Sequence, residues 1–213
     1  MEFNVTYYPE KEEKINIISH GLGAILSLVA FPFLLIKAFK TKDPEVILSF
    51  IIYGSSMIIL YVASTLYHSA KNKKYRYYLN IFDHASVYIL IAGTYAPVAL
   101  VVLEGRLGWL VFGGSWLLAI FGVVYKVYFI GKYKTLSIMS YVLMGWMLIV
   151  VIKPLLNNFS DKGVLFLLLG GIFYSVGALF FTLQKLKFNH AIFHVLVLFG
   201  SLCHFLAIYC YSI

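Results

Sequence analysis

Apolar stretches of about twenty residues recur seven times along this chain of 213 residues. A helix that crosses the hydrocarbon core of a bilayer needs ~20 mostly apolar residues. The stretches are continuous and do not alternate with polar residues, which disfavours a transmembrane β-barrel. The sequence therefore predicts an all-α, polytopic membrane protein, a seven-transmembrane helix bundle with spans at roughly 16–38, 46–68, 80–102, 108–128, 136–156, 163–184 and 190–211.

Little of the chain is left outside these spans. We expect residues 1–15 to form a cytoplasmic N-terminal segment and residues 16–213 to form one seven-helix transmembrane domain. The net charge of +8 comes from Lys and Arg in short loops beside the spans, which leaves no basic soluble segment for nucleic acid. The function classes that remain are those of a membrane protein.

The positive charges are distributed unequally between the two ends of the predicted bundle. With the N-terminus inside, eleven of the 17 Lys and Arg residues fall on the inner side. Cytoplasmic loops of membrane proteins carry such an excess. The sequence thus predicts a cytoplasmic N-terminus and, with an odd number of spans, an outer C-terminus in a multi-pass protein of the cell membrane.

Polar side chains are predicted to converge at the cytoplasmic end of this bundle. Of nine acidic residues, only Asp83 lies within a predicted span. An acidic residue inside a membrane is a candidate functional group, because burying it without a partner costs several kcal/mol. Five of the six histidines fall at the same end, namely His20, His68, His84, His190 and His194.

Two pairs at helical spacing indicate a metal site. His190 and His194 are four residues apart, as are Ser64 and His68, so each pair shares one face of a helix. Three imidazoles and a water molecule satisfy a tetrahedral zinc ion that keeps one position open. His68, His190 and His194 are the predicted ligands, and Asp83 is the acid placed to take a proton from water.

Structural roles compete with this interpretation. A single membrane histidine is more often a hydrogen-bond partner between helices than a ligand. The run from His190 to His194 has the spacing of a zinc-protease motif but carries Ala191 where that motif needs its Glu. His204 lies ~15 Å deeper than His194 and is expected to be a buried polar partner, whereas His20 either lines a cavity or caps the bundle.

The combination of motifs resembles the hemolysin III family, the bacterial branch of the progestin and adiponectin receptor superfamily. The resemblance covers nearly the whole chain. It rests on Glu13-x-x-Asn16-x-x-x-His20, Ser64-x-x-x-His68, the run from Asp83 to Pro97, Gly171-x-x-Tyr174-x-x-Gly177, His190-x-x-Phe193-His194 and Gly200-Ser201-x-x-His204-Phe205.

This resemblance implies a zinc site near the cytoplasmic face of a bacterial plasma-membrane protein. It implies His68, His190 and His194 as ligands, Asp83 as the residue that holds the water molecule of the site, and Ser64 beside it. Members of the family often carry Glu at the position of Ala191, which weakens any mechanism that needs a second acid.

Three functions stay open at this stage. The first is a zinc-dependent hydrolase that cleaves the amide bond of a membrane lipid, since receptor relatives are linked to ceramide hydrolysis. The second is a cytolysin that forms a pore, as the family name suggests. The third is a receptor-like or lipid-homeostasis protein with structural zinc. Membrane lipids are the expected partners, and neither the substrate nor the oligomeric state follows from the sequence.

Overall fold

Helices form nearly all of the part of the chain that the computed structural model describes, which is residue 3 and residues 5–213. No strand occurs among these residues, so the all-α prediction is confirmed. The elements are α1 (Glu10–Thr41), α2 (Pro44–Ser69), α3 (Lys73–Pro97), the π-helical turn η1 (Val98–Leu103), α4 (Gly105–Phe129), α5 (Lys134–Gly145), the 3₁₀ turn η2 (Met147–Val151), α6 (Ile152–Asn158), α7 (Asp161–Thr182) and α8 (Asn189–Tyr211).

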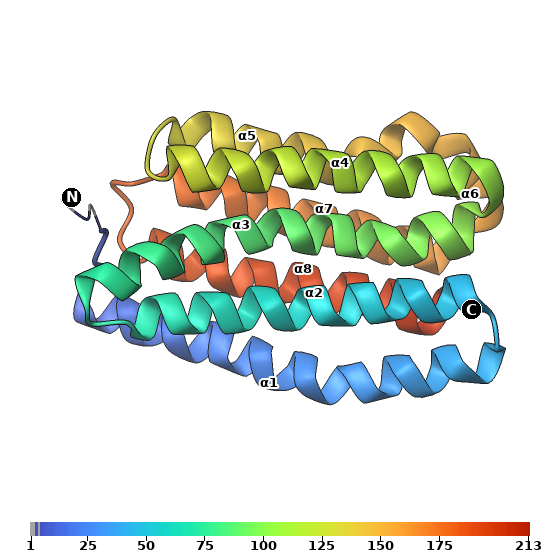
Figure 1. Ribbon diagram of the computed structural model, residues 1–213, viewed down its shortest axis with the longest axis horizontal. Coiled ribbons are helices and arrows are strands. Elements are labelled where there is room, and N and C mark those ends of the chain that lie inside the picture. Colours follow the sequence, from blue (N-terminus) through green and yellow to red (C-terminus); the bar gives the residue numbers. More distant parts are fainter. Residues whose placement is uncertain (1–2, 4) are drawn as a thin grey trace.

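Seven of the described helical stretches are long and apolar enough to cross a membrane, and they coincide with the seven predicted spans. The N-terminal and C-terminal ends of the chain lie at opposite ends of the bundle (Figure 1), as an odd number of crossings requires. Which end faces the cytoplasm stays a prediction. Of the predicted segment 1–15, residues 1, 2 and 4 lie outside the described residues, and α1 already begins at Glu10.

Polar side chains fix where several of these helices begin. The Asp43 carboxylate accepts hydrogen bonds from the backbone N–H groups of the first turn of α2, which has Pro44 at its first position. Asn72 caps α3 and Ser160 caps α7 in the same way. Each cap satisfies N–H groups that lack a partner within the helix. The loops can therefore stay short, which forces successive helices to lie antiparallel.

The helices close a ring around an internal cavity. α1, α2 and α3 pack in sequence, α4 and α5 contact α3, α7 contacts α5, and α8 joins α7 to α1. Glycines allow the closest approaches: a Cβ atom at Gly23 would overlap the ring of Tyr61, and one at Gly170 would overlap the ring of His204. Small residues commonly serve this purpose where membrane helices meet.

The fifth span is not one continuous helix. The sequence predicts one helix over 136–156, but α5 ends at Gly145 and the chain continues through η2 into α6. The Tyr95 hydroxyl of α3 donates to the carbonyl oxygens of Met144 and Gly145, at 2.8 and 3.0 Å, and accepts from the Leu148 N–H. Irregular backbone at membrane depth is tolerated where protein groups satisfy it in this way.

Candidate metal centre and its cavity

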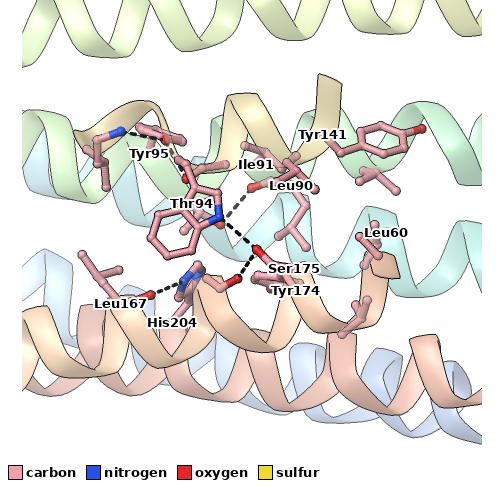
Figure 2. A pocket seen from close by; sticks show the side chains of 18 of the residues that line it. Leu60, Leu90, Ile91, Thr94, Tyr95, Tyr141, Leu167, Tyr174, Ser175 and His204 are labelled. Atoms are coloured by element: carbon pink, nitrogen blue, oxygen red, sulfur yellow. Dashed lines mark hydrogen bonds between the residues drawn. The ribbon is translucent and has the colours of Figure 1, made fainter. Parts of the chain in front are cut away.

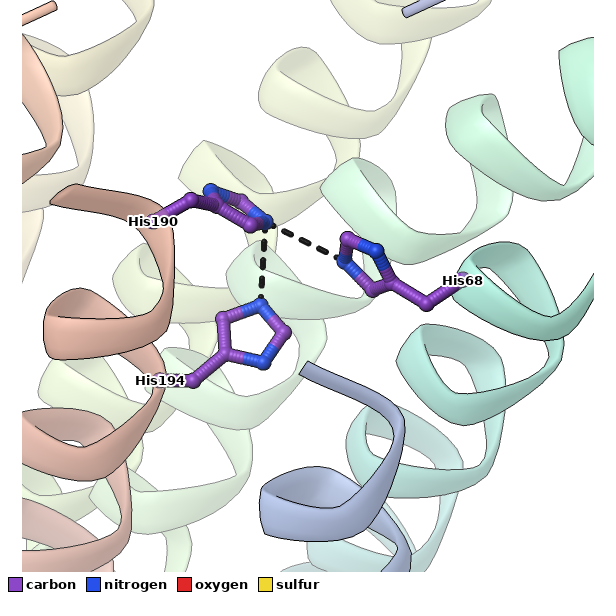
Figure 3. Close-up of side chains that lie close together, drawn as sticks. All are labelled: His68, His190 and His194. Atoms are coloured by element: carbon purple, nitrogen blue, oxygen red, sulfur yellow. Dashed lines mark hydrogen bonds between the residues drawn. The ribbon is translucent and has the colours of Figure 1, made fainter. Parts of the chain in front are cut away.

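Three histidines from two helices meet at the end of the bundle where the N-terminal segment lies. His68 comes from the last turn of α2, and His190 and His194 come from the first two turns of α8. Nε2 of His190 lies 3.1 Å from Nε2 of His68 and 3.0 Å from Nε2 of His194. Figure 3 shows the three rings pointing at one another, and all three side chains are buried.

The outward nitrogens of two of these rings are held by α1. Nδ1 of His68 lies 2.7 Å from a carboxylate oxygen of Glu13. Nδ1 of His194 lies 3.5 Å from the hydroxyl oxygen of Ser19, whose own proton goes to the Asn16 carbonyl. In both cases Nδ1 is therefore the donor, and the Nε2 atoms of His68 and His194 present lone pairs to the centre.

This arrangement fits a metal ion. With lone pairs on two Nε2 atoms, the single proton available to Nε2 of His190 cannot satisfy both neighbours, and the lone pair of one of them is left without a donor. A cation between the rings removes the conflict. Nitrogens at about 2.1 Å from a tetrahedral zinc ion lie roughly 3.4 Å apart, close to the spacings observed. The buried group of His68, His190 and His194 can thus hold a metal ion.

Arg76 anchors the carboxylate that orients His68. Its guanidinium, only 1% exposed, forms an ion pair with Glu13 and donates to backbone carbonyls at the end of α2 and in the N-terminal segment. A buried ion pair with its remaining donors satisfied holds a fixed geometry. Arg76 therefore fixes Glu13, and Glu13 in turn fixes the tautomer of His68.

Replacement of Glu13 by Gln should weaken metal binding about 10- to 100-fold, the usual cost of losing a carboxylate that supports a ligand histidine. The amide keeps the size of the side chain but loses its charge. Competition with a coloured chelator measures the affinity. Glu10→Gln is the matched control, because Glu10 lies on the same helix and pairs only with the exposed Lys14. Equal affinities for the two variants would refute the role of Glu13.

The two predicted catalytic residues lie beside the histidines. Ser64, fully buried, is one turn before His68 on α2, and Asp83, 9% exposed, faces them from α3. The Ser64 hydroxyl and the His68 ring are close enough to interact with the Asp83 carboxylate. The structure brings the five predicted site residues together, while the catalytic roles of Ser64 and Asp83 stay predictions.

A cavity of about 410 Å³ begins at this site and runs into the bundle. Ser64, Asp83, His190 and His194 line one end, and mostly apolar residues of α3, α5, α6, α7 and α8 line the rest. Figure 2 shows the deeper part of the cavity, where His204 points toward α7. Its Nε2 atom lies 3.1 Å from the backbone carbonyl oxygen of Leu167. His204 thus has a polar partner, as the sequence predicted, although its side chain is only partly buried.

Two further residues that the sequence did not mark as functional reach the site. The Lys126 side chain of α4 is buried, with Nζ 5.3 Å from the centroid of the Tyr141 ring and close enough to interact with Asp83. Tyr8, in the N-terminal segment, stacks on His190 with ring centroids 4.4 Å apart. Burial, and after it the neighbouring Tyr67 hydroxyl and the nearby carboxylates, raise the pKa of the Tyr8 hydroxyl above its usual value, so it stays protonated. No motif signalled either residue.

Comparisons with known proteins agree with this architecture. The family described as Haemolysin-III related matches residues 8–205. Hemolysin-3 of Bacillus cereus is 46% identical over 201 residues, which cover 94% of this chain and 92% of the relative. Hemolysin-3 homolog of Bacillus subtilis (strain 168) is 44% identical over 203 residues, 95% of each chain.

A more distant similarity extends to animals. Monocyte to macrophage differentiation factor of Homo sapiens is 29% identical over 170 residues, which cover 75% of this chain and 68% of the relative. The resemblance drawn from the motifs, including the wider receptor superfamily, is confirmed. With a family match across almost its whole length and two bacterial relatives above 40% identity, this multi-pass membrane protein belongs to the haemolysin-III related family.

Proposed function

We propose that this protein is a zinc-dependent hydrolase of the cell membrane that cleaves the amide bond of a membrane lipid. Its N-terminus and the three histidines face the cytoplasm, and the acyl chain of the lipid occupies the cavity. The observation that carries the proposal is the continuity of one cavity, which joins His190, His194, Ser64 and Asp83 to a long apolar interior.

The chemistry of the lining supports an acyl lipid. An apolar pocket with a few polar groups at one end binds a ligand that is itself apolar except at one end. A zinc ion held by His68, His190 and His194 supplies a Lewis acid toward carbonyl and water oxygens. Buried beside these ligands, Asp83 offers a carboxylate base and Ser64 offers a hydroxyl donor for the developing oxyanion.

The reaction balances without a further reactant. Water adds to the amide carbonyl carbon, and Asp83 accepts the proton that the water loses. The C–N bond then breaks, and the same proton passes from Asp83 to the leaving nitrogen. The products are a fatty acid and an amine, and Asp83 returns to its starting state.

The purified protein in phosphatidylcholine nanodiscs that contain ceramide tests the proposal. We expect release of free fatty acid, measured by mass spectrometry, that stops when a chelator removes the metal and resumes when zinc is returned. A folded, zinc-loaded protein that releases no fatty acid from ceramide or other lipid amides would refute hydrolysis and leave a structural metal. Leakage from liposomes without amide lipids would instead support the pore-forming alternative.

A further inference from the structure

The polar residues in the first three turns of α1 that face the bundle support the metal centre, with one exception. Besides the contacts of Glu13 and Ser19, the Glu12 carboxylate accepts a hydrogen bond of 3.1 Å from the backbone N–H of His190. The Asn16 carbonyl accepts the proton of the Ser19 hydroxyl and so leaves that oxygen free to accept from His194. All five residues of this stripe are on one side of α1: Glu12, Glu13, Asn16, Ser19 and His20. Among these five, His20 is the residue whose side-chain nitrogens take part in no hydrogen bond.

His20 is buried without a partner for either ring nitrogen. Its side chain is 3% exposed. The backbone of His194 lies near the ring, but neither Nδ1 nor Nε2 forms a hydrogen bond with a described residue. A buried polar group without a partner costs about 1–3 kcal/mol. Buried polar atoms without partners are uncommon in folded proteins, and such a pair calls for a ligand or an ordered water.

The position of His20 excludes it as a fourth metal ligand. Its ring stacks on that of His194, with centroids 3.5 Å apart and planes 11° apart, and the edge of Tyr61 meets it from another side. Lone pairs of imidazole lie in the ring plane. The lone pairs of two parallel rings do not converge on one ion, so a metal bound by His194 is out of reach of His20.

His20 lines the cavity at the end that Ser64 and Asp83 also line. A neutral imidazole has one N–H donor and one lone pair, whichever tautomer is present. We infer that the N–H of His20 donates a hydrogen bond to the carbonyl oxygen of an acyl lipid bound in the cavity, and so holds the carbonyl beside the three histidines. This inference takes the class of lipid from the proposed function, but it does not require that the lipid is hydrolysed.

Binding of a fatty-acid amide tests this role without requiring hydrolysis. The zinc-loaded protein in detergent is titrated with oleamide, and with a hydrocarbon of the same chain length that lacks the carbonyl, and both are followed by native mass spectrometry. His20→Phe keeps the ring stacked on His194 and the contact with Tyr61, but removes both nitrogens. We expect it to weaken oleamide binding about 3- to 10-fold, the equivalent of one hydrogen bond, with hydrocarbon binding and zinc content unchanged.

Two further variants make the result specific. His20→Gln retains a side-chain N–H and should bind oleamide with an affinity between those of wild type and His20→Phe. Tyr53→Phe removes a buried polar group of α2 that does not line the cavity and should leave the affinity for oleamide within twofold of wild type.

The outcomes separate this inference from the proposed function. Unchanged oleamide affinity in His20→Phe, an equal loss for the hydrocarbon, loss of zinc, or failure of the wild type to bind oleamide would each overturn the role of His20. Binding that depends on His20 in a protein that never hydrolyses an amide would uphold this role while refuting hydrolysis.

Discussion

Replacement of His190 by alanine is expected to lower the affinity for zinc about a thousandfold, so that the purified variant carries almost no metal. Protein sites with cysteine and histidine ligands bind zinc with roughly 10–16 kcal/mol, and removing one ligand of three forfeits about a third of that. Nε2 of His190 is also the atom that faces both other ligands, at 3.1 and 3.0 Å. Elemental mass spectrometry of the purified protein gives zinc per chain, with about one expected for wild type.

The control for this experiment lies on the same helix. His204 is a second histidine of α8, hydrogen-bonded to the Leu167 carbonyl and remote from the three ligands, so His204→Ala should keep its zinc. Retention of a full zinc ion by folded His190→Ala, or its absence from folded wild type supplied with zinc, would rule out the three-histidine site. The proposed hydrolysis, which depends on zinc held by these histidines, would then be refuted.

Replacement of Asp83 by asparagine is expected to reduce fatty-acid release about 10²- to 10⁴-fold while zinc content stays at the wild-type level. This range is the usual contribution of a general base. Asparagine preserves the size of the side chain, which is 9% exposed, but cannot accept a proton from water. Rates of ceramide hydrolysis in nanodiscs, compared at equal zinc content, measure the effect.

An acid elsewhere on the surface provides the comparison for Asp83. Asp161 is exposed in the first turn of α7, so Asp161→Asn should hydrolyse ceramide at the wild-type rate. A wild-type rate in Asp83→Asn would remove the carboxylate from the mechanism. Loss of zinc together with activity would instead make Asp83 part of the metal site.

The spans and the meeting of the three candidate ligands could be predicted because each depends on a short-range pattern. Twenty consecutive apolar residues have few alternatives to a membrane helix. The spacing of His190 and His194 places both rings on one helix face wherever that helix packs. The alternation of crossings then brings the end of α2 to the start of α8, and His68 follows.

The supporting residues could not be predicted, because charge counting treats all basic residues near a span alike. Arg76 and Lys126 stand where loop residues of the positive-inside rule stand, yet both side chains are buried beside the site. Their burial depends on acidic partners supplied by other helices, Glu13 on α1 and Asp83 on α3. The break in the fifth span was also invisible, because its residues are apolar on both sides of Gly145.

The ligands are separated in the chain by 122 residues, between His68 and His190, and this separation has a consequence for biosynthesis. Two of the three histidines come from α8, which leaves the ribosome after the other described helices, while the residues that contact them lie on α1. A nascent chain arrested before α8 carries only His68 of the three, however well its early helices insert. A metal ion that needs all three histidines can therefore bind only late in assembly, once α1 and α8 have met.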